Sequence, residues 1–206
     1  MDLIEDYGTL KAAVASYLHR TDQADNIPVF ISLGISTINR ECRSRLMEEA
    51  YTTTVSASAS SIPLPADYKE MRSVTVNDVP LRQVTFEKLH QMVNDTAGQP
   101  YYYAISGSTL HLSPSLDADY TLGLVYFANI TAFTADTDTH PLLVTNPNLF
   151  VYAAMTEAMP FLHSEARLPR WADMLIVTLK SENESSEAAR WSGGPLRIES
   201  TYTDTP

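Results

Sequence analysis

The sequence predicts an α+β protein in which a helical bundle is interrupted by an antiparallel, β-rich insertion that contains a short helix. Apolar residues recur at helical spacing towards both ends of the chain, whereas the middle alternates with a period of two. Turn signals such as Asn77-Asp78 separate the alternating segments. The 206 residues suffice for one domain or two closely packed subdomains. The expected segments are 1–45 and 141–191 for the two halves of the bundle, 46–140 for the insertion and 192–206 for an extended tail.

The N-terminal half of the bundle is predicted to contain two helices. Apolar spacing indicates a first helix over residues 9–19, with Thr9 as its N-cap. Asn26 is expected to cap a second helix that reaches about residue 44. Gly34 lies on or beside the apolar stripe of this helix, where glycine costs about 1 kcal/mol relative to alanine. It therefore indicates either the close approach of another helix or a tolerated defect.

The insertion is predicted to be an antiparallel meander of about five short strands. Two-residue turns between alternating strands need no crossover helices. A short helix is expected over residues 86–94, and the two prolines of Ile62–Pro65 exclude that segment from the centre of a sheet. The segments with strand-like alternation are 51–55, 71–76, 79–84, 101–105, 110–112 and 120–127.

The C-terminal half of the bundle is predicted to contain two more helices. Asn146-Pro147 gives a cap followed by proline in the first turn, and the helix after it is apolar on nearly every side. The last helix carries an apolar stripe from Leu168 to Leu179 that includes Ile176. Helix-forming residues continue to Trp191, so this polar extension is either solvated or packed on a partner.

The charge of the chain restricts its function. Fourteen basic and 25 acidic residues give a net charge of −11, with −1 in residues 1–45, −7 in 46–140 and −3 in 141–206. Such a surface repels phosphates, which argues against sequence-specific nucleic-acid binding but not against a surface that nucleic acid passes. Cys42 is the sole cysteine, and no apolar stretch approaches the roughly 20 residues of a membrane span. With no signal-peptide pattern at its start, the protein is expected to be made and used without export.

The sequence contains no recognisable catalytic motif, so we predict no catalytic residue, cofactor or metal. A nucleophile elbow, a phosphate-binding loop and a dinucleotide fingerprint are all lacking, and the five histidines occur singly. Two alternatives remain open. The tyrosines 101–103 are typical of a carbohydrate- or peptide-binding surface, although alternation turns them to opposite faces of a strand. Asp136 and Asp138 are compatible with a metal-dependent hydrolase, although aspartates in loops more often close turns.

Two groups of residues are candidates for contacts with other chains. Arg40, Arg43 and Arg45 lie at the end of the second helix, where they complement the helix dipole or form an intersubunit contact. The tail carries apolar residues with nothing local to pack on, which favours docking on another chain or folding back on the bundle. The docking candidates are Trp191, Leu196, Arg197 and Ile198.

Short segments in a fixed order run along most of the chain. They are Tyr17-Leu18-x-Arg20, Ile27-Pro28-x-Phe30-Ile31, Ile38-Asn39-Arg40, Leu64-Pro65-Ala66-Asp67-Tyr68, Gly98-Gln99-Pro100-Tyr101-Tyr102, Leu112-x-Pro114, Asp119-Tyr120-Thr121-Leu122 with Tyr126, Thr145-Asn146, Leu149-Phe150-x-Tyr152, Glu157-Ala158 and Gly193-Gly194-Pro195-Leu196. In this order the segments resemble those of the head–tail adaptor, or connector, proteins of tailed bacteriophages.

The resemblance implies a structural role in the virion neck and no active site. It implies a homo-oligomeric ring, typically of twelve copies, that docks beneath the portal protein, continues the DNA channel and offers a platform to tail, nozzle or tail-terminator proteins. It also implies synthesis in the cytoplasm of the host bacterium, with a C-terminal tail that reaches the portal. An acidic channel wall repels DNA within about 8–10 Å at physiological salt. The candidates for this wall are Glu182, Glu184 and Glu187, which are otherwise a solvated helix face.

Overall fold

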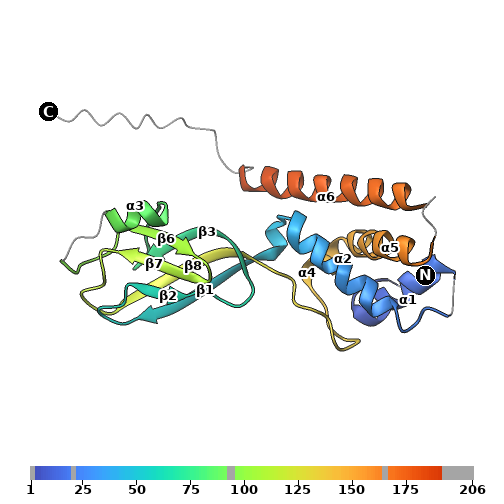
Figure 1. Cartoon of the computed structure of the whole chain (residues 1–206), viewed down its shortest axis with the longest axis horizontal. Helices are drawn as coiled ribbons and strands as arrows, with labels where there is room; N and C mark the ends of the chain where they lie inside the picture. Colours follow the sequence, from blue (N-terminus) through green and yellow to red (C-terminus); the bar gives the residue numbers. More distant parts are fainter. Residues whose placement is uncertain (1–2, 20–21, 92–95, 164–166, 192–206) are drawn as a thin grey trace. The chain divides into compact units, whose positions relative to one another are not determined.

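The computed structural model describes residues 3–19, 22–91, 96–163 and 167–191, which divide into two compact units (Figure 1). The helical unit comes from residues 1–44 and 143–206, and the β unit from residues 45–142. The chain is therefore α+β, as predicted. Each unit is described by itself below.

Helix α1 (Tyr7–Leu18) begins two residues earlier than predicted. Asp6 is its N-cap: the carboxylate Oδ1 accepts a hydrogen bond of 2.8 Å from the Thr9 backbone N–H. Thr9 Oγ1 in turn accepts from the Asp6 N–H at 3.1 Å, which completes a capping box. The bond from the Thr9 backbone N–H, and a second of 2.8 Å from the Thr9 hydroxyl, lower the pKa of the Asp6 carboxyl. Thr9 is thus the third residue of the helix and not its cap, because the aspartate before it can accept the same backbone bonds.

Helix α2 (Ile27–Glu41) ends three residues before the predicted position, at an extended Cys42. Asn26 occupies the N-cap position without a side-chain capping bond. Its amide donates instead to Gln23 Oε1 at 2.9 Å. The buried face of α2 comprises Ile27, Phe30, Ile31, Gly34, Ile35 and Ile38.

Three helices form the C-terminal part: α4 (Pro141–Thr145), α5 (Pro147–Phe161) and α6 (Leu168–Trp191). The short α4 was not predicted. Helix α5 is buried on nearly all sides, as its composition indicated, and packs against α1, α2 and α6. On α6, Leu175 and Leu179 are buried, but Ile176 is 61% exposed. The prediction that Ile176 belongs to the packed stripe is wrong, because the buried face of α6 covers fewer residues than the apolar stripe in the sequence.

Gly34 marks the closest packing in the helical unit. A Cβ at this position would lie 2.9 Å from the Ala154 backbone nitrogen and 3.0 Å from the Ala153 Cβ. These distances are shorter than ordinary van der Waals contact, so α2 and α5 approach each other at a point where only glycine fits. Of the two interpretations of Gly34, close helix approach is confirmed.

The β unit holds two four-stranded sheets with orders β1-β8-β3-β4 and β2-β7-β6-β5. The strands are β1 (Glu48–Val55), β2 (Ser61–Pro63), β3 (Tyr68–Val76), β4 (Val79–Pro80), β5 (Arg82–Gln83), β6 (Tyr102–Ser106), β7 (Thr109–Ser113) and β8 (Tyr120–Ala128). The predicted meander is wrong, because β8 inserts between β1 and β3 and β5 pairs with β6 in parallel. A core that includes Val74, Leu110 and Leu124 draws on both sheets.

Local signals in the β unit were predicted more accurately than the pairing. Asn77 and Asp78 both have positive φ, 46° and 65°, between β3 and β4, which is the conformation that a tight two-residue hairpin turn requires. The proline-containing β2 is an edge strand. Helix α3 (Phe86–Gln91) contacts β6 and β7 and buries Leu89. The 3-10 turn η1 (Arg45–Met47) precedes β1.

Candidate functional site

Helices α2 and α6 contact different sides of α5. Gly34 of α2 lies against Ala153 and Ala154, whereas the Trp171 ring of α6 lies 5.9 Å from the Tyr152 ring of α5. Successive residues of an α-helix project about 100° apart, so the midpoint of Ala153 and Ala154 lies about 150° around the helix from Tyr152. The three helices therefore form a layer with α5 in the centre, and the outer faces of α2 and α6 point in opposite directions.

The outer helices of this layer run in the same direction. At one end of α5, the Phe161 ring lies 5.3 Å from Phe30, near the start of α2. At the other end, Asn146 bonds to Glu182, near the end of α6. Both outer helices are thus antiparallel to α5 and parallel to each other, as can be followed in Figure 1.

A polar junction holds the far end of α6 to the other helices. The Glu182 carboxylate accepts hydrogen bonds from Ser44 Oγ at 2.5 Å, from Ser186 Oγ at 3.3 Å and from the Asn146 amide. Ser44 and Ser186 are buried. Glu182 is therefore turned into the unit and separated from the exposed Glu184 and Glu187, so the predicted group of three glutamates does not form one surface.

Asn183 extends the junction to the end of α2. Its Oδ1 accepts from the Arg43 backbone N–H at 2.7 Å, and its Nδ2 donates to the Glu41 carbonyl at 3.1 Å. The extension of α6 beyond Leu179 thus packs on its own unit through polar side chains. Sequence reasoning missed this because the apolar stripe, which was the signal for packing, ends before the packing does.

The three arginines have different surroundings. Arg43 Nη1 donates to the Arg40 carbonyl at 2.7 Å in the last turn of α2, in agreement with the helix-dipole interpretation. Arg40 forms an exposed ion pair of 2.8 Å with Glu41. Arg45 lies in η1 and belongs to the β unit. An intersubunit role for these residues stays a prediction.

Apolar side chains are exposed on both outer faces of the layer. Val29 and Leu33 on α2 are 54% and 48% exposed, and Ile176 and Val177 on α6 are 61% and 67% exposed. The charged residues around Val177 include Lys180, whose Nζ lies 3.8 Å from Glu184 on the same helix. These mixed apolar and charged faces are candidates for contact with another chain.

The tyrosine segment offers less surface than its composition indicates. Tyr103 is buried in the β core, where its hydroxyl lies 3.5 Å from Gln83 Oε1 and burial raises its pKa. Tyr102 is half-buried and Tyr101 is 61% exposed. A ligand-binding surface built from all three rings is therefore not formed.

The loop aspartates accept hydrogen bonds from the backbone: Asp138 closes a turn, whereas Asp119 joins two distant loops. Asp138 Oδ2 accepts from the backbone N–H groups of Thr134 and Ala135 at 2.7 and 2.8 Å, which lowers the pKa of Asp138. Asp119 Oδ1 accepts from the Ala57 N–H at 2.9 Å. In the described part of the chain, no three His, Cys, Asp or Glu side chains lie close enough together to hold a metal ion.

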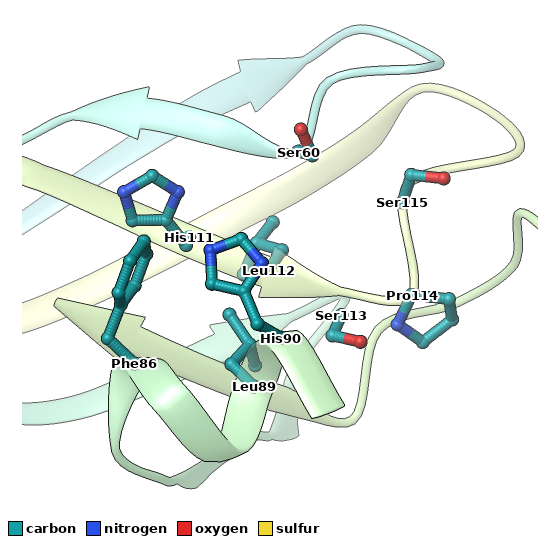
Figure 2. Close-up of a pocket in the computed structure, with 9 residues that line it drawn as sticks. All are labelled: Ser60, Phe86, Leu89, His90, His111, Leu112, Ser113, Pro114 and Ser115. Atoms are coloured by element: carbon teal, nitrogen blue, oxygen red, sulfur yellow. The ribbon is translucent and has the colours of Figure 1, made fainter. Parts of the chain in front are cut away.

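A hollow of about 270 Å³ lies between α3 and β7 in the β unit. Figure 2 shows Phe86 and His90 on α3 directed towards His111 on β7. The Phe86 ring lies 4.5 Å from His90 and 4.9 Å from His111, in edge-to-face geometry. Because ligand sites usually exceed about 300 Å³ and these rings pack on one another, we interpret the hollow as part of the contact between α3 and the sheet.

The predicted tail contacts fall largely outside the described residues. Leu196, Arg197 and Ile198 lie beyond them, and Trp191 is the last residue of α6. None of the helices described combines the length and the apolarity that crossing a bilayer requires.

A comparison with known protein families identifies the family of the chain. The family model of the SU10 adaptor protein matches residues 5–199. The chain belongs to the SU10 adaptor protein family. This is a family of phage head–tail adaptors, which confirms the resemblance found in the sequence, and the adaptor is a structural protein of a phage. Comparison with curated proteins found no match.

Proposed function

We propose that this adaptor forms a homo-oligomeric ring beneath the phage portal, extends the DNA channel and provides the platform on which tail proteins dock. The observation that carries the proposal is the family match over residues 5–199, which includes most of both the helical unit and the β unit. By analogy with phage adaptors, the ring is expected to hold twelve copies. The protein would be made in the bacterial cytoplasm and would reside in the virion neck.

The shape of the helical layer supports a ring. A closed ring of identical subunits with head-to-tail contacts needs two different surfaces on each subunit. The outer faces of α2 and α6 point away from each other and carry exposed apolar residues, among them Leu33 and Val177. Neither alternative function has such support, because Tyr103 lies in the core and Asp138 closes a turn.

The net charge of −11 suits a channel through which DNA slides without being held. Glu184 and Glu187 stay candidates for the acidic wall, whereas the Glu182 carboxylate is already used inside the unit. Glu184 and Glu187 are also candidates for a contact with the neighbouring subunit, and in that case they would not line the channel.

The C-terminal tail is proposed to bind the portal. The residues assigned to this contact are Trp191, Leu196, Arg197 and Ile198, because they combine apolar side chains and one cation beyond the last packed turn of α6. Tail or nozzle proteins would bind elsewhere on the ring.

Cryo-electron microscopy of purified particles that contain this chain tests the proposal. We expect density for a ring of the chain between the portal and the tail, in particles from cells that express the wild-type gene. Particles from a deletion strain serve as the control and should lack both the ring and the tail. Full particles without this chain in the neck would refute the proposed function.

A further inference from the structure

We propose that the outer face of α2 in one subunit packs in parallel against the outer face of α6 in the next, so that the layers join into one continuous belt of helices. This inference rests on the proposed ring and names the surfaces that close it. The occupant of each face is therefore a second copy of this chain.

Both faces have the residue spacing of a helix–helix seam. Their members are exposed and follow one another at intervals of three or four residues, which keeps them on one side of a helix. The α2 outer face consists of Val29, Leu33, Ser36 and Arg40, and Asp25 lies in the turn just before the helix. The α6 outer face consists of Arg170, Asp173, Val177, Lys180, Glu184 and Glu187.

The charges at the ends of the two faces select a parallel register. Placing Val29 and Leu33 opposite Val177 buries these three apolar residues against one another and leaves Ile176 outside the seam. Arg40 lies about 14 Å beyond the centre of its apolar pair, and Glu184 and Glu187 lie about 10–15 Å beyond Val177, at 1.5 Å per residue. In the parallel orientation, Arg40 therefore meets the two glutamates.

The charges near the N-terminal ends of α2 and α6 favour the same parallel orientation. Asp25 lies in the turn just before α2, and Arg170 lies about 10 Å before Val177 on α6. The parallel orientation brings this aspartate to the end of the α6 face that carries Arg170, with Asp173 one turn further along. The antiparallel orientation would instead place Arg40 at Arg170 and Asp25 at Glu184, which are pairs of like charge.

The geometry of the subunit leads to the same orientation independently. Within one subunit, α2 and α6 are parallel and lie on different sides of α5. In a ring of twelve copies, each neighbour is rotated by only about 30°, so its α6 keeps nearly the same direction. A contact between α2 and the neighbouring α6 must then be close to parallel, as the charges require.

Crosslinking in assembled particles tests the contact. The variant carries Leu33→Cys together with Val177→Cys, is supplied to a deletion strain, and is treated in purified particles with a short bis-maleimide crosslinker. Because α5 separates the two sites within one subunit, we expect a ladder of linked dimers, trimers and higher oligomers. The single variants should give no ladder, and neither should Leu33→Cys with Val144→Cys, since Val144 is exposed but lies on neither face. In the wild type, the one cysteine, Cys42, is buried.

The outcomes separate this contact from the proposed function. A ring in the neck with no ladder above the control level would refute the α2–α6 contact and leave the adaptor function in place. Absence of the chain from the neck would refute both. A ladder in the single variants would show like-to-like contacts and would also overturn the proposal.

A charge exchange in the crosslinkable variant supplies the second test, because it alters the charges of the seam and leaves the two cysteines unchanged. Arg40→Glu is expected to reduce crosslinking of the Leu33→Cys and Val177→Cys variant, by at most about fivefold per interface as for exposed ion pairs. Adding Glu184→Arg with Glu187→Arg should restore it. Reduction without restoration would contradict the proposed register.

Discussion

Replacing Gly34 by alanine tests how tightly the central layer is packed. The added Cβ would lie 2.9 Å from the Ala154 backbone nitrogen and 3.0 Å from the Ala153 Cβ. Neither atom is the flexible end of a side chain, so α2 would have to move away from α5 by about half an ångström to restore ordinary contact of about 3.5 Å.

The expected cost follows from two opposing terms. Overpacking a close contact costs about 1–3 kcal/mol, and the displaced helix also loosens the packing of Phe30 and Ile31. Alanine in place of glycine would return about 1 kcal/mol through its higher helix propensity. Because neither neighbouring atom is the end of a flexible side chain, the upper part of the overpacking range applies, about 2–3 kcal/mol. We therefore expect a net loss of about 1–2 kcal/mol in the free energy of unfolding, or about 2–8 °C in melting temperature.

Tryptophan fluorescence during denaturation measures this loss in the relevant unit. The Trp171 ring lies 5.8 Å from Tyr17 and 5.9 Å from Tyr152, so its emission reports on the helical unit. Ser32→Ala, at an exposed position on α2, is the matched control and should be neutral or slightly stabilising. A Gly34→Ala variant as stable as this control would refute the packing argument and show that the glycine is a tolerated defect.

Three further predictions concern the junction, a histidine and the tail. Glu182→Ala should cost about 1–3 kcal/mol because it removes the carboxylate that accepts from Ser44, Ser186 and Asn146. Glu184→Ala, at an exposed position, should change stability by less than about 0.5 kcal/mol in the same denaturation experiment. His140 Nδ1 accepts from the Leu142 N–H at 3.1 Å, and burial lowers the pKa of His140 below its ordinary value of 6.5. The stability contributed by neutral His140 is therefore present above pH 6.5 and lost as the pH falls through the lowered pKa. A His140→Gln variant should lose less stability than the wild type as the pH falls below 6.5. An unchanged dependence of stability on pH would contradict this assignment. Truncation after Gly194 should leave the thermal melt unchanged while weakening capture by the purified portal protein, and a collapse of the melt would place the tail in the core.

The sequence was sufficient where one segment determines its own conformation. The helical spacing located α2, α5 and α6, and Asn77-Asp78 located a tight turn, because these signals lie within a few residues of the structure they specify. At Gly34 the sequence identified the right position but left two causes open. Only the packing of α5 against it decided between them.

The rest depended on contacts between distant segments. The insertion of β8 between β1 and β3 joins strands from both ends of the β unit, and no local pattern specifies this order. The same holds for Glu182, whose partners Ser44 and Asn146 are 138 and 36 residues away along the chain. Its charged neighbours made it look like part of an exposed face, whereas its interaction with a buried serine turned it inwards.

The division of the helical unit into two stretches of chain has a consequence for biosynthesis. Helix α2 reaches its partner α5 only after the whole insertion has been made, and Arg43 bonds to a residue 140 positions later. The β unit, by contrast, is continuous and can fold while the ribosome still holds the last helices. The helical layer, with both of its outer faces, is then completed only when translation has nearly ended. In the proposed ring, a chain that ends before α6 would keep its α2 face but lack the α6 face, so it could contact only one neighbour.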